Sequence, residues 1–173
     1  MLLALMGLLV AACGEQETKQ RLIMVTEATF PPYEFYRGSE IVGIDADIVR
    51  EVARRNNLQP VIEDMSFDSV ITAVQSGKAD VAASGITVTE DRRKQIDFTR
   101  SYAMAQQVII VPKGSAISGP EGLKGLRLGV QHGTTGDLYV TEHIGQPERF
   151  SNGALAVAAL AAGKLDAVVL DSA

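Results

Sequence analysis

The chain has 173 residues, of which 46% are hydrophobic, 5% aromatic and 21% charged, and 16 Lys and Arg against 21 Asp and Glu leave a net charge of −5. This composition is typical of a folded globular protein and excludes collagen-like, disulfide-stapled and intrinsically disordered chains. The acidic balance disfavours nucleic-acid binding, which depends on clustered Lys and Arg. One Cys, two His and no Trp provide little material for a transition-metal site. We therefore expect a small organic ligand, no nucleic acid, no metal and no cofactor.

The first 12 residues resemble the hydrophobic part of an export signal. They are rich in Leu and Ala, carry no charge and fall short of the ~20 residues that span a bilayer. Three small residues directly precede Cys13, a pattern similar to the lipobox of bacterial lipoproteins, in which the Cys is lipidated. We expect a signal peptide at 1–12, a lipidated Cys13 and a polar tether at 13–20. The alternative is a buried segment with an incidental free thiol.

From Arg21 onward, short apolar strands alternate with amphipathic helices. In chain order the pattern predicts a strand at 22–25, a loop at 30–33, a helix at 44–55, a strand at 61–62, a helix at 67–76, a strand at 81–84, a short helix at 89–95 and a strand at 107–111. This alternation favours an α/β architecture with a largely parallel sheet.

Turn-forming residues at 112–115 and 119–122 interrupt that regularity and indicate a domain junction. We expect a first lobe at 21–112 and a second lobe at 113–173. In the second lobe the pattern predicts a strand at 126–130, a tight turn at 133–136, helices at 137–143 and 152–163, and a strand at 167–170.

The chain also contains an internal repeat. Residues 74–81 match residues 160–167 at an offset of 86, and each copy is the end of a helix, a Gly, a Lys, an Asp and a buried strand. Two sibling α/β lobes explain this offset, although a chance match of a common unit is the alternative. The same offset aligns Gly85 with Asp171, just past the carboxyl ends of two strands, where open α/β sheets bind ligands.

Residues of opposite charge stand at these strand ends. Arg92 lies in the first turn of a helix, where it is disfavoured by the helix dipole unless it faces an anion, and Asp171 is suited to an ammonium group. The turn at 133–136 offers backbone donors, and Phe30 and Phe67 are candidate apolar walls. Ion pairs of Arg92 with neighbouring acidic residues, a capping role for Asp171 and core packing of the Phe residues are the alternatives. Together the residues match an α-amino acid zwitterion, whose charges must be paired when buried.

Several segments resemble the bacterial extracellular solute-binding proteins of family 3, the amino-acid receptors of ABC importers. The resemblance is carried by Phe30-Pro31-Pro32-Tyr33, Gly43-Ile44-Asp45-Ala46-Asp47-Ile48, Gln75-Ser76-Gly77-Lys78-Ala79-Asp80-Val81, Gly85-Ile86-Thr87-Val88-Thr89 with Arg92, and Phe98-Thr99 with Tyr102, and it continues more loosely beyond 112. It implies a two-lobed, type II periplasmic-binding-protein fold in which the second lobe and the return segment are truncated.

The resemblance also implies a role for each site residue. Arg92 and the backbone N–H groups of Thr87 and Thr135 would hold the ligand carboxylate. The Thr87 hydroxyl, the Gly85 carbonyl and Asp171 would hold its ammonium group. Phe30 and Phe67 would enclose the ligand side chain, and the remaining residues would tune specificity: Glu27, Ser84 and Gln131.

The function so implied is that of a lipid-anchored, monomeric, non-enzymatic receptor, in the periplasm or on the outer face of the cell membrane, which delivers an amino acid to an ABC permease. Glu27 favours a polar or basic amino acid. One alternative is an enzyme on the same fold, similar to cyclohexadienyl dehydratase, with His132, Glu27 or Asp171 as the acid or base. Another is a sensory ligand-binding domain.

Overall fold

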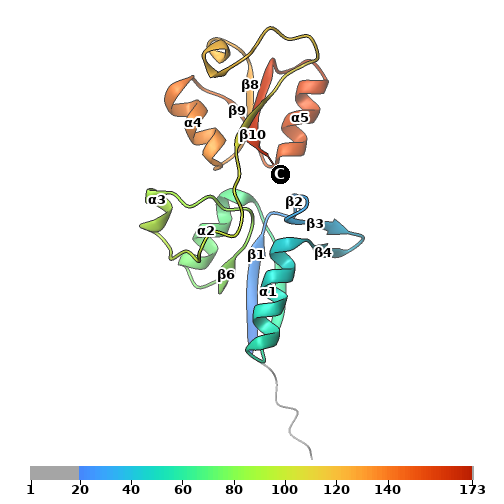
Figure 1. Cartoon of the computed structure of the whole chain (residues 1–173), viewed down its shortest axis with the longest axis vertical. Helices are drawn as coiled ribbons and strands as arrows, with labels where there is room; N and C mark the ends of the chain where they lie inside the picture. The colour runs from blue at the N-terminus through green and yellow to red at the C-terminus, as the bar shows by residue number, and fades with distance from the viewer. Residues whose placement is uncertain (1–19, 173) are drawn as a thin grey trace, which may run out of the picture.

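A computed structural model describes residues 20–172, which form two lobes arranged along the long axis of the molecule (Figure 1). The expected signal peptide, Cys13 and nearly all of the tether lie outside the described residues. The elements up to the end of the first lobe are β1 (Arg21–Thr26), β2 (Thr29–Phe30), β3 (Glu34–Arg37), β4 (Glu40–Val42), α1 (Ile44–Arg55), β5 (Gln59–Asp64), α2 (Phe67–Gln75), β6 (Val81–Ala82) and α3 (Glu90–Arg93). Those that follow are β7 (Gln107–Ile110), the 3-10 helix η1 (Pro120–Leu123), β8 (Leu128–Gln131), α4 (Thr135–His143), β9 (Glu148–Phe150), α5 (Gly153–Ala161) and β10 (Ala167–Asp171).

The first lobe is built on a parallel sheet in the order β5-β1-β6. Strand β1 lies in the middle, and Val25 packs with Val70 of α2 in a fully buried cluster. Helix α1 has Asp in its first turn and Arg in its last turn, the order that the helix dipole favours. Two residues after the end of α1, Asn57 takes the left-handed conformation (φ 55°), which Asn adopts more readily than most residues at the end of a helix.

The second lobe contains a mixed sheet in the order β7-β10-β8-β9. Its core gathers Leu123, Val130 and Val140, all at most 1% exposed. Strand β7 pairs antiparallel with β10, so it belongs to this sheet and not to the first lobe, where the boundary at 112 placed it. The reason is that an apolar run shows that a strand forms but does not show which strand it pairs with. The connection between the sheets therefore precedes Gln107.

A small antiparallel sheet, β2-β3-β4, was not predicted. Its strands have two to four residues, too few to give a readable hydrophobic period. Phe30, expected in a loop, lies in β2, and the turn after it leads directly to Glu34 in β3. This sheet carries both side chains to the boundary between the lobes.

The internal repeat is confirmed at atomic detail. Gly77 and Gly163 have nearly the same backbone angle, φ 73° and 72°. In the first copy the Asp80 carboxylate accepts the Ile23 N–H at 2.7 Å. In the second copy the Asp166 carboxylate accepts the Arg127 N–H at 2.8 Å. In both lobes, the equivalent Asp of the repeat thus hydrogen-bonds to the backbone at the start of the neighbouring strand.

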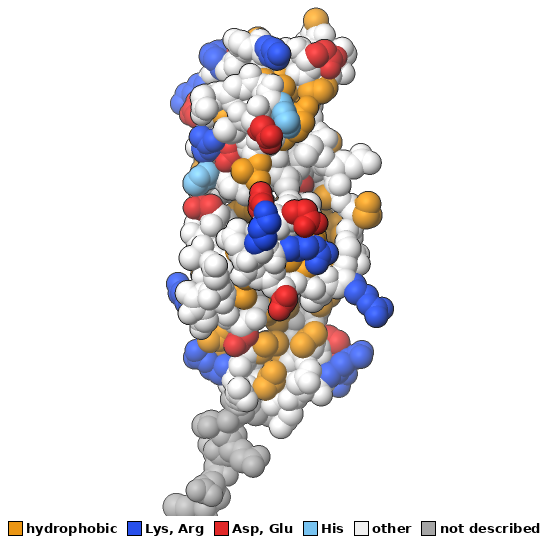
Figure 2. Space-filling view, turned by 90° about the vertical axis from the view of Figure 1, so that its left-hand side faces the viewer, with side chains coloured by type: hydrophobic (Ala, Val, Ile, Leu, Met, Phe, Trp, Pro, Cys, Tyr) orange, Lys and Arg blue, Asp and Glu red, His pale blue; other side chains and the backbone are white. Residues whose placement is uncertain are grey.

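Figure 2 shows basic and acidic side chains interspersed over both lobes on one face of the molecule. Across residues 20–172, no helix combines the length and the apolar character needed to cross a bilayer.

Candidate functional site

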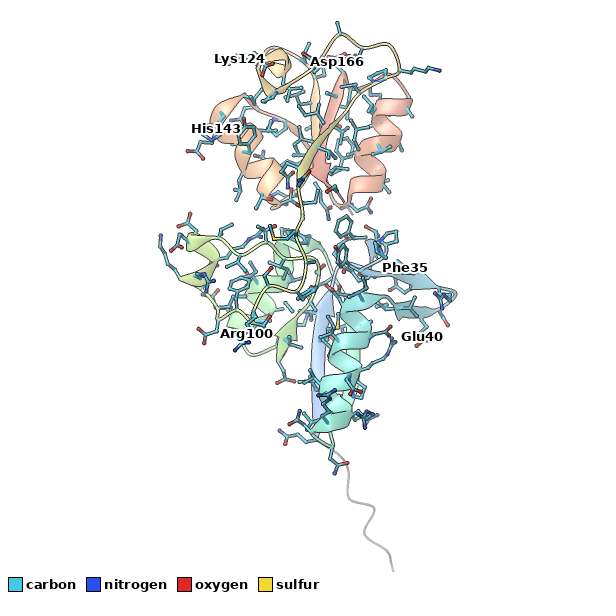
Figure 3. All side chains as sticks on the ribbon, viewed as in Figure 1. Phe35, Glu40, Arg100, Lys124, His143 and Asp166 are labelled. Atoms are coloured by element: carbon cyan, nitrogen blue, oxygen red, sulfur yellow. The ribbon has the colours of Figure 1, made fainter. Side chains whose placement is uncertain are left out.

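A cavity lies between the two lobes, with about 540 Å³ of space free of protein atoms, including its open mouth. Asp166 lies toward the end of the second lobe away from the first (Figure 3), and β10 runs from there to a C-terminal end between the lobes (Figure 1). The lining includes all ten residues predicted to bind the ligand: Glu27, Phe30, Phe67, Ser84, Gly85, Thr87, Arg92, Gln131, Thr135 and Asp171. Five residues that were not predicted also line it: Thr29, Glu34, Thr134, Gly153 and Leu170. Their binding roles remain predictions.

The parallel strands account for this convergence. Strands β1 and β6 of the first lobe and β8 and β10 of the second all end at the cavity, because the residues that follow or complete them line it. Open α/β sheets place their ligands at such carboxyl ends, where loops leave backbone groups unpaired. The topology thus brings together residues as distant in sequence as Glu27 and Asp171.

Arg92 is the main cation of the cavity, and only 6% of it is exposed. Its Nη1 donates to the Thr87 carbonyl at 2.8 Å, and its Nη2 donates across the gap to the Gly133 carbonyl at 3.0 Å. The guanidinium carbon lies 5.5 Å from the centre of the Phe67 ring. Asp91 pairs instead with Lys94 at 2.7 Å, so this local alternative for Arg92 is excluded. A guanidinium has five N–H donors, which leaves donors available for a carboxylate.

Burial lowers the pKa of Arg92, and the negative charge of Asp171 partly opposes that effect. Burial likewise raises the pKa of Asp171, while a hydrogen bond from Gln107 and the charge of Arg92 act in the opposite direction. The charge of each group therefore favours the ionised form of the other across the cavity. The two charges form a dipole with its ends in different lobes.

Gln107 holds Asp171 in place. Its amide nitrogen donates to Asp171 Oδ1 at 2.7 Å and to the Thr135 hydroxyl at 2.9 Å. It was missed because the sequence analysis placed its strand in the first lobe.

Glu27 is a second buried carboxylate, 7% exposed, on the first-lobe side of the cavity. The Thr29 hydroxyl lies 2.8 and 2.9 Å from its two oxygens, and Gln131 Nε2 donates to it from the other lobe at 3.2 Å. Burial raises its pKa, the hydrogen bonds from Thr29 and Gln131 oppose the rise, and the charge of Asp64 adds to it. Because burial disfavours the ionised form of this carboxylate, a cationic partner would stabilise that form strongly.

The Ser84–Gly85 edge of the cavity rests on two buried acids that the sequence analysis did not assign to the site. Gly85 has φ 53°, and a Cβ there would lie 3.2 Å from the Phe30 ring, so a glycine is required. Its N–H donates to Asp45 Oδ2 at 3.0 Å. Ser84 donates to Glu34 Oε1 at 3.2 Å. The signal available for Asp45 was its place in the segment 43–48; no sequence pattern marked Glu34.

The lobes touch each other around the cavity. Besides the Arg92–Gly133 and Gln131–Glu27 bonds, His132 Nδ1 of the second lobe lies 3.5 Å from Asp68 Oδ2 of the first. The lobes are thus drawn together over the cavity. Across the part of the chain that the structure describes, no cluster of three or more His, Cys, Asp or Glu side chains is arranged to hold a metal ion. With a guanidinium in one lobe and a carboxylate in the other, the cavity is suited to a small zwitterion.

Known proteins of similar sequence and structure agree with this chemistry. The family described as "Bacterial extracellular solute-binding proteins, family 3" matches residues 22–167. "Arginine-binding extracellular protein ArtP" of Bacillus subtilis is 37% identical over 140 residues, which are 73% of this chain and 55% of that protein. A "Probable histidine-binding protein" of Neisseria gonorrhoeae is 35% identical over 156 residues, which are 87% of this chain and 58% of that protein.

Solved structures show the same fold. The arginine-bound form of truncated ArgBP from T. maritima superposes with a TM-score of 0.83 at 42% identity, over 88% of this chain and 74% of that one. The predicted two-lobed α/β fold is confirmed. This chain spans little more than half the length of the two curated relatives named above.

Proposed function

Because this chain belongs to the bacterial extracellular solute-binding proteins of family 3, we propose that it forms part of the amino-acid-binding component of an ABC importer, with arginine as the preferred ligand. The observation that carries the proposal is the pair of opposite charges, Arg92 and Asp171, that faces one cavity from two lobes. Since the relatives are longer, the proposal concerns the whole protein of which these lobes are part.

The ligand's zwitterionic end would bind between these charges. The free donors of Arg92 and the backbone N–H groups of Thr87 and Thr135 hold the carboxylate. Thr135 opens α4, where the first N–H groups have no acceptor within the helix. Asp171, the Gly85 carbonyl and the Thr87 hydroxyl hold the ammonium group. Each buried charge of the ligand thus receives an opposite charge and hydrogen bonds, which offset the cost of desolvation.

The ligand side chain would extend between Phe30 and Phe67 toward Glu27. A guanidinium suits this space because its flat faces pack on aromatic rings and its edge donates to a carboxylate. Ser84 and Gln131 add hydrogen-bonding groups beside Glu27. The names of the relatives support a basic ligand, since two of them are called arginine- or histidine-binding.

Binding and closure require no chemical step. A ligand that contacts both lobes binds the closed arrangement more tightly than an open one, so it shifts the equilibrium toward the closed form. The closed, loaded form is the state that a permease would recognise. We propose that the protein acts as a monomer and without catalysis; the binding-protein names of its relatives support the second part of this proposal.

We also propose that Cys13 is lipidated after removal of residues 1–12, which would hold the protein in the periplasm or on the outer face of the cell membrane. The relatives include proteins named as extracellular and as periplasmic. Blocking lipoprotein signal peptidase with globomycin should leave a larger precursor in the cell, and a Cys13→Ser variant should lack the acyl chains. Normal processing of that variant would contradict the anchor.

The binding proposal is tested with the full-length mature protein. Thermal unfolding is measured with each of the common amino acids, because a ligand that binds only the folded state raises the melting temperature. We expect the largest rise with L-arginine, followed by confirmation of one site by calorimetry. A rise with sugars or metal ions, and with no amino acid, would overturn the proposal.

A further inference from the structure

Two acids that are not part of the expected ligand contacts are buried next to each other at the Ser84–Gly85 edge, and one of them, Glu34, also lines the cavity. Glu34 of β3 is 1% exposed and Asp45 of α1 is 0% exposed. Asp45 accepts the Gly85 N–H at 3.0 Å on Oδ2 and the Tyr102 hydroxyl at 2.8 Å on Oδ1. Glu34 accepts the Ser84 hydroxyl on Oε1, and no donor among the described residues reaches its Oε2.

Two adjacent buried carboxyl groups cannot both be ionised without a cation to balance them. The groups that act on the charge of Glu34 are Asp45, Ser84 and Glu27, and none of them is cationic. Asp45 holds the negative charge better, because two donors stabilise its carboxylate. The proton therefore belongs on Glu34, and Oε2, which no donor reaches, is the atom able to carry it and to donate it to Asp45.

The charges around Glu34 support this assignment. Burial, the negative charge of Asp45 and a hydrogen bond to Asp45 raise the pKa of Glu34 to about 10; the Ser84 hydroxyl opposes the rise, and the charge of Glu27 adds to it. Burial and the same Asp45 carboxylate also raise the pKa of Tyr102, which keeps that hydroxyl a donor. At neutral pH Glu34 is thus the protonated member of the cluster.

A protonated Glu34 connects this cluster to the cavity. Its O–H donates toward Asp45 while its other oxygen accepts from Ser84, whose own oxygen accepts the Glu27 N–H at 2.9 Å. Asp45 in turn fixes the Gly85 N–H, and so the direction of the Gly85 carbonyl. The two acids together hold the edge of the cavity that the ligand's ammonium group approaches.

We propose that Glu34 is a neutral, proton-bearing positioning residue, which with Asp45 fixes the Ser84–Gly85 edge in the geometry that receives the ammonium group of the ligand. The inference rests on the proposed amino-acid binding and adds a residue to it. A neutral Glu34 also avoids adding a further negative charge to a site that already contains Glu27 and Asp171, a charge that would repel the carboxylate of the ligand.

The test compares Glu34→Gln with Glu34→Leu in the full-length mature protein, with L-arginine as the probe in calorimetry. Gln keeps one donor and one acceptor and carries no charge, as a protonated acid does, whereas Leu keeps the bulk and removes both bonds. We expect a Kd about tenfold weaker for Glu34→Leu and recovery to within about threefold for Glu34→Gln. Glu40→Leu is the control, because Glu40 is an exposed carboxylate on the neighbouring strand β4.

Two results would overturn the inference. If Glu34→Leu binds arginine as the wild type does, Glu34 positions nothing. If Glu34→Gln loses as much affinity as Glu34→Leu, the charged form is the one required.

The protonation state is tested separately by the carboxyl 13C resonance of Glu34, assigned by its loss in Glu34→Gln. We expect it to keep the shift of a protonated acid between pH 6 and pH 8, and ionisation in that range would overturn the inference even if Glu34→Leu does not fold. Failure of the wild type to bind any amino acid would instead refute the proposed function.

Discussion

Replacing Arg92 by Ala removes the cation that the ligand carboxylate would meet, together with the hydrogen bond from the guanidinium to the Gly133 carbonyl of the other lobe. Truncating one member of a buried, hydrogen-bonded charge pair costs about 2–5 kcal/mol. We therefore expect the Kd for L-arginine to rise from about 30-fold to several thousand-fold. The measurement is calorimetric titration of the full-length mature protein.

The same substitution should leave the unliganded protein folded. The hydrogen bonds of the Arg92 side chain are to backbone carbonyls at the cavity, where water can replace a lost donor. Burial also lowers the pKa of Arg92, which means that burying its charge opposes folding. We expect the free energy of unfolding to change by about 1 kcal/mol or less, while the rise in melting temperature with arginine disappears.

Arg93 provides a matched control, because it follows on the same helix and is exposed. Arg93→Ala should bind arginine as the wild type does. If Arg92→Ala retained an affinity within about threefold of the wild type, or if Arg93→Ala lost as much, the carboxylate would bind elsewhere and the reasoning would be refuted.

Three further predictions concern carboxylates. Glu27→Gln should weaken arginine binding about tenfold or more and change glutamine binding much less; equal losses in calorimetry would show that Glu27 does not contact the side chain. Burial raises the pKa of Asp171 above its unfolded value. At a pH above this raised pKa the ionised carboxylate destabilises the folded state, whereas below the unfolded pKa both states are protonated and the effect disappears. Asp171→Asn should therefore unfold at a higher urea concentration than the wild type at pH 7, lose this advantage at pH 3, and bind arginine more weakly. Burial acts to raise the pKa of Asp137, but its hydrogen bonds from Arg149 and the Gly133 N–H hold it below the usual value. Its stabilisation is therefore full above the unfolded pKa and is lost as the pH falls through the lower folded pKa. Asp137→Ala should cost about 2 kcal/mol at pH 7 and progressively less below about pH 3, and a loss independent of pH would contradict this.

Local patterns were sufficient for most of the helices and strands. The spacing of apolar residues located α1 and α2, and the first residues of the predicted helices at 89–95 and 152–163, Thr89 and Asn152, accept the capping N–H bonds of α3 and α5. These features are readable because capping and amphipathic packing depend on residues within one or two turns. The strands of the small sheet and β9 (Glu148–Phe150) were missed, since they are short and are stabilised by partners remote in the chain.

The ten residues predicted to bind the ligand came from the repeat and the family resemblance, and the structure brings all ten to one cavity. Residues that support these ten from other positions were harder to recognise. Glu34 and Gln107 carry no motif of their own, and each matters through a contact with a residue at least 28 positions away: Ser84 for Glu34, and Thr135 and Asp171 for Gln107.

The amino-acid sequence by itself determined the alternation of strands and helices, the duplication of the lobes and the identity of the charged groups at the strand ends, because each of these is encoded within a short window. Only the tertiary structure decided which sheet β7 joins, that Arg92 reaches the carbonyl of Gly133 in the other lobe, and that Glu34 and Asp45 share a buried space without a cation. Pairing, burial and the resulting protonation depend on what surrounds a side chain in three dimensions, and those neighbours come from distant parts of the chain.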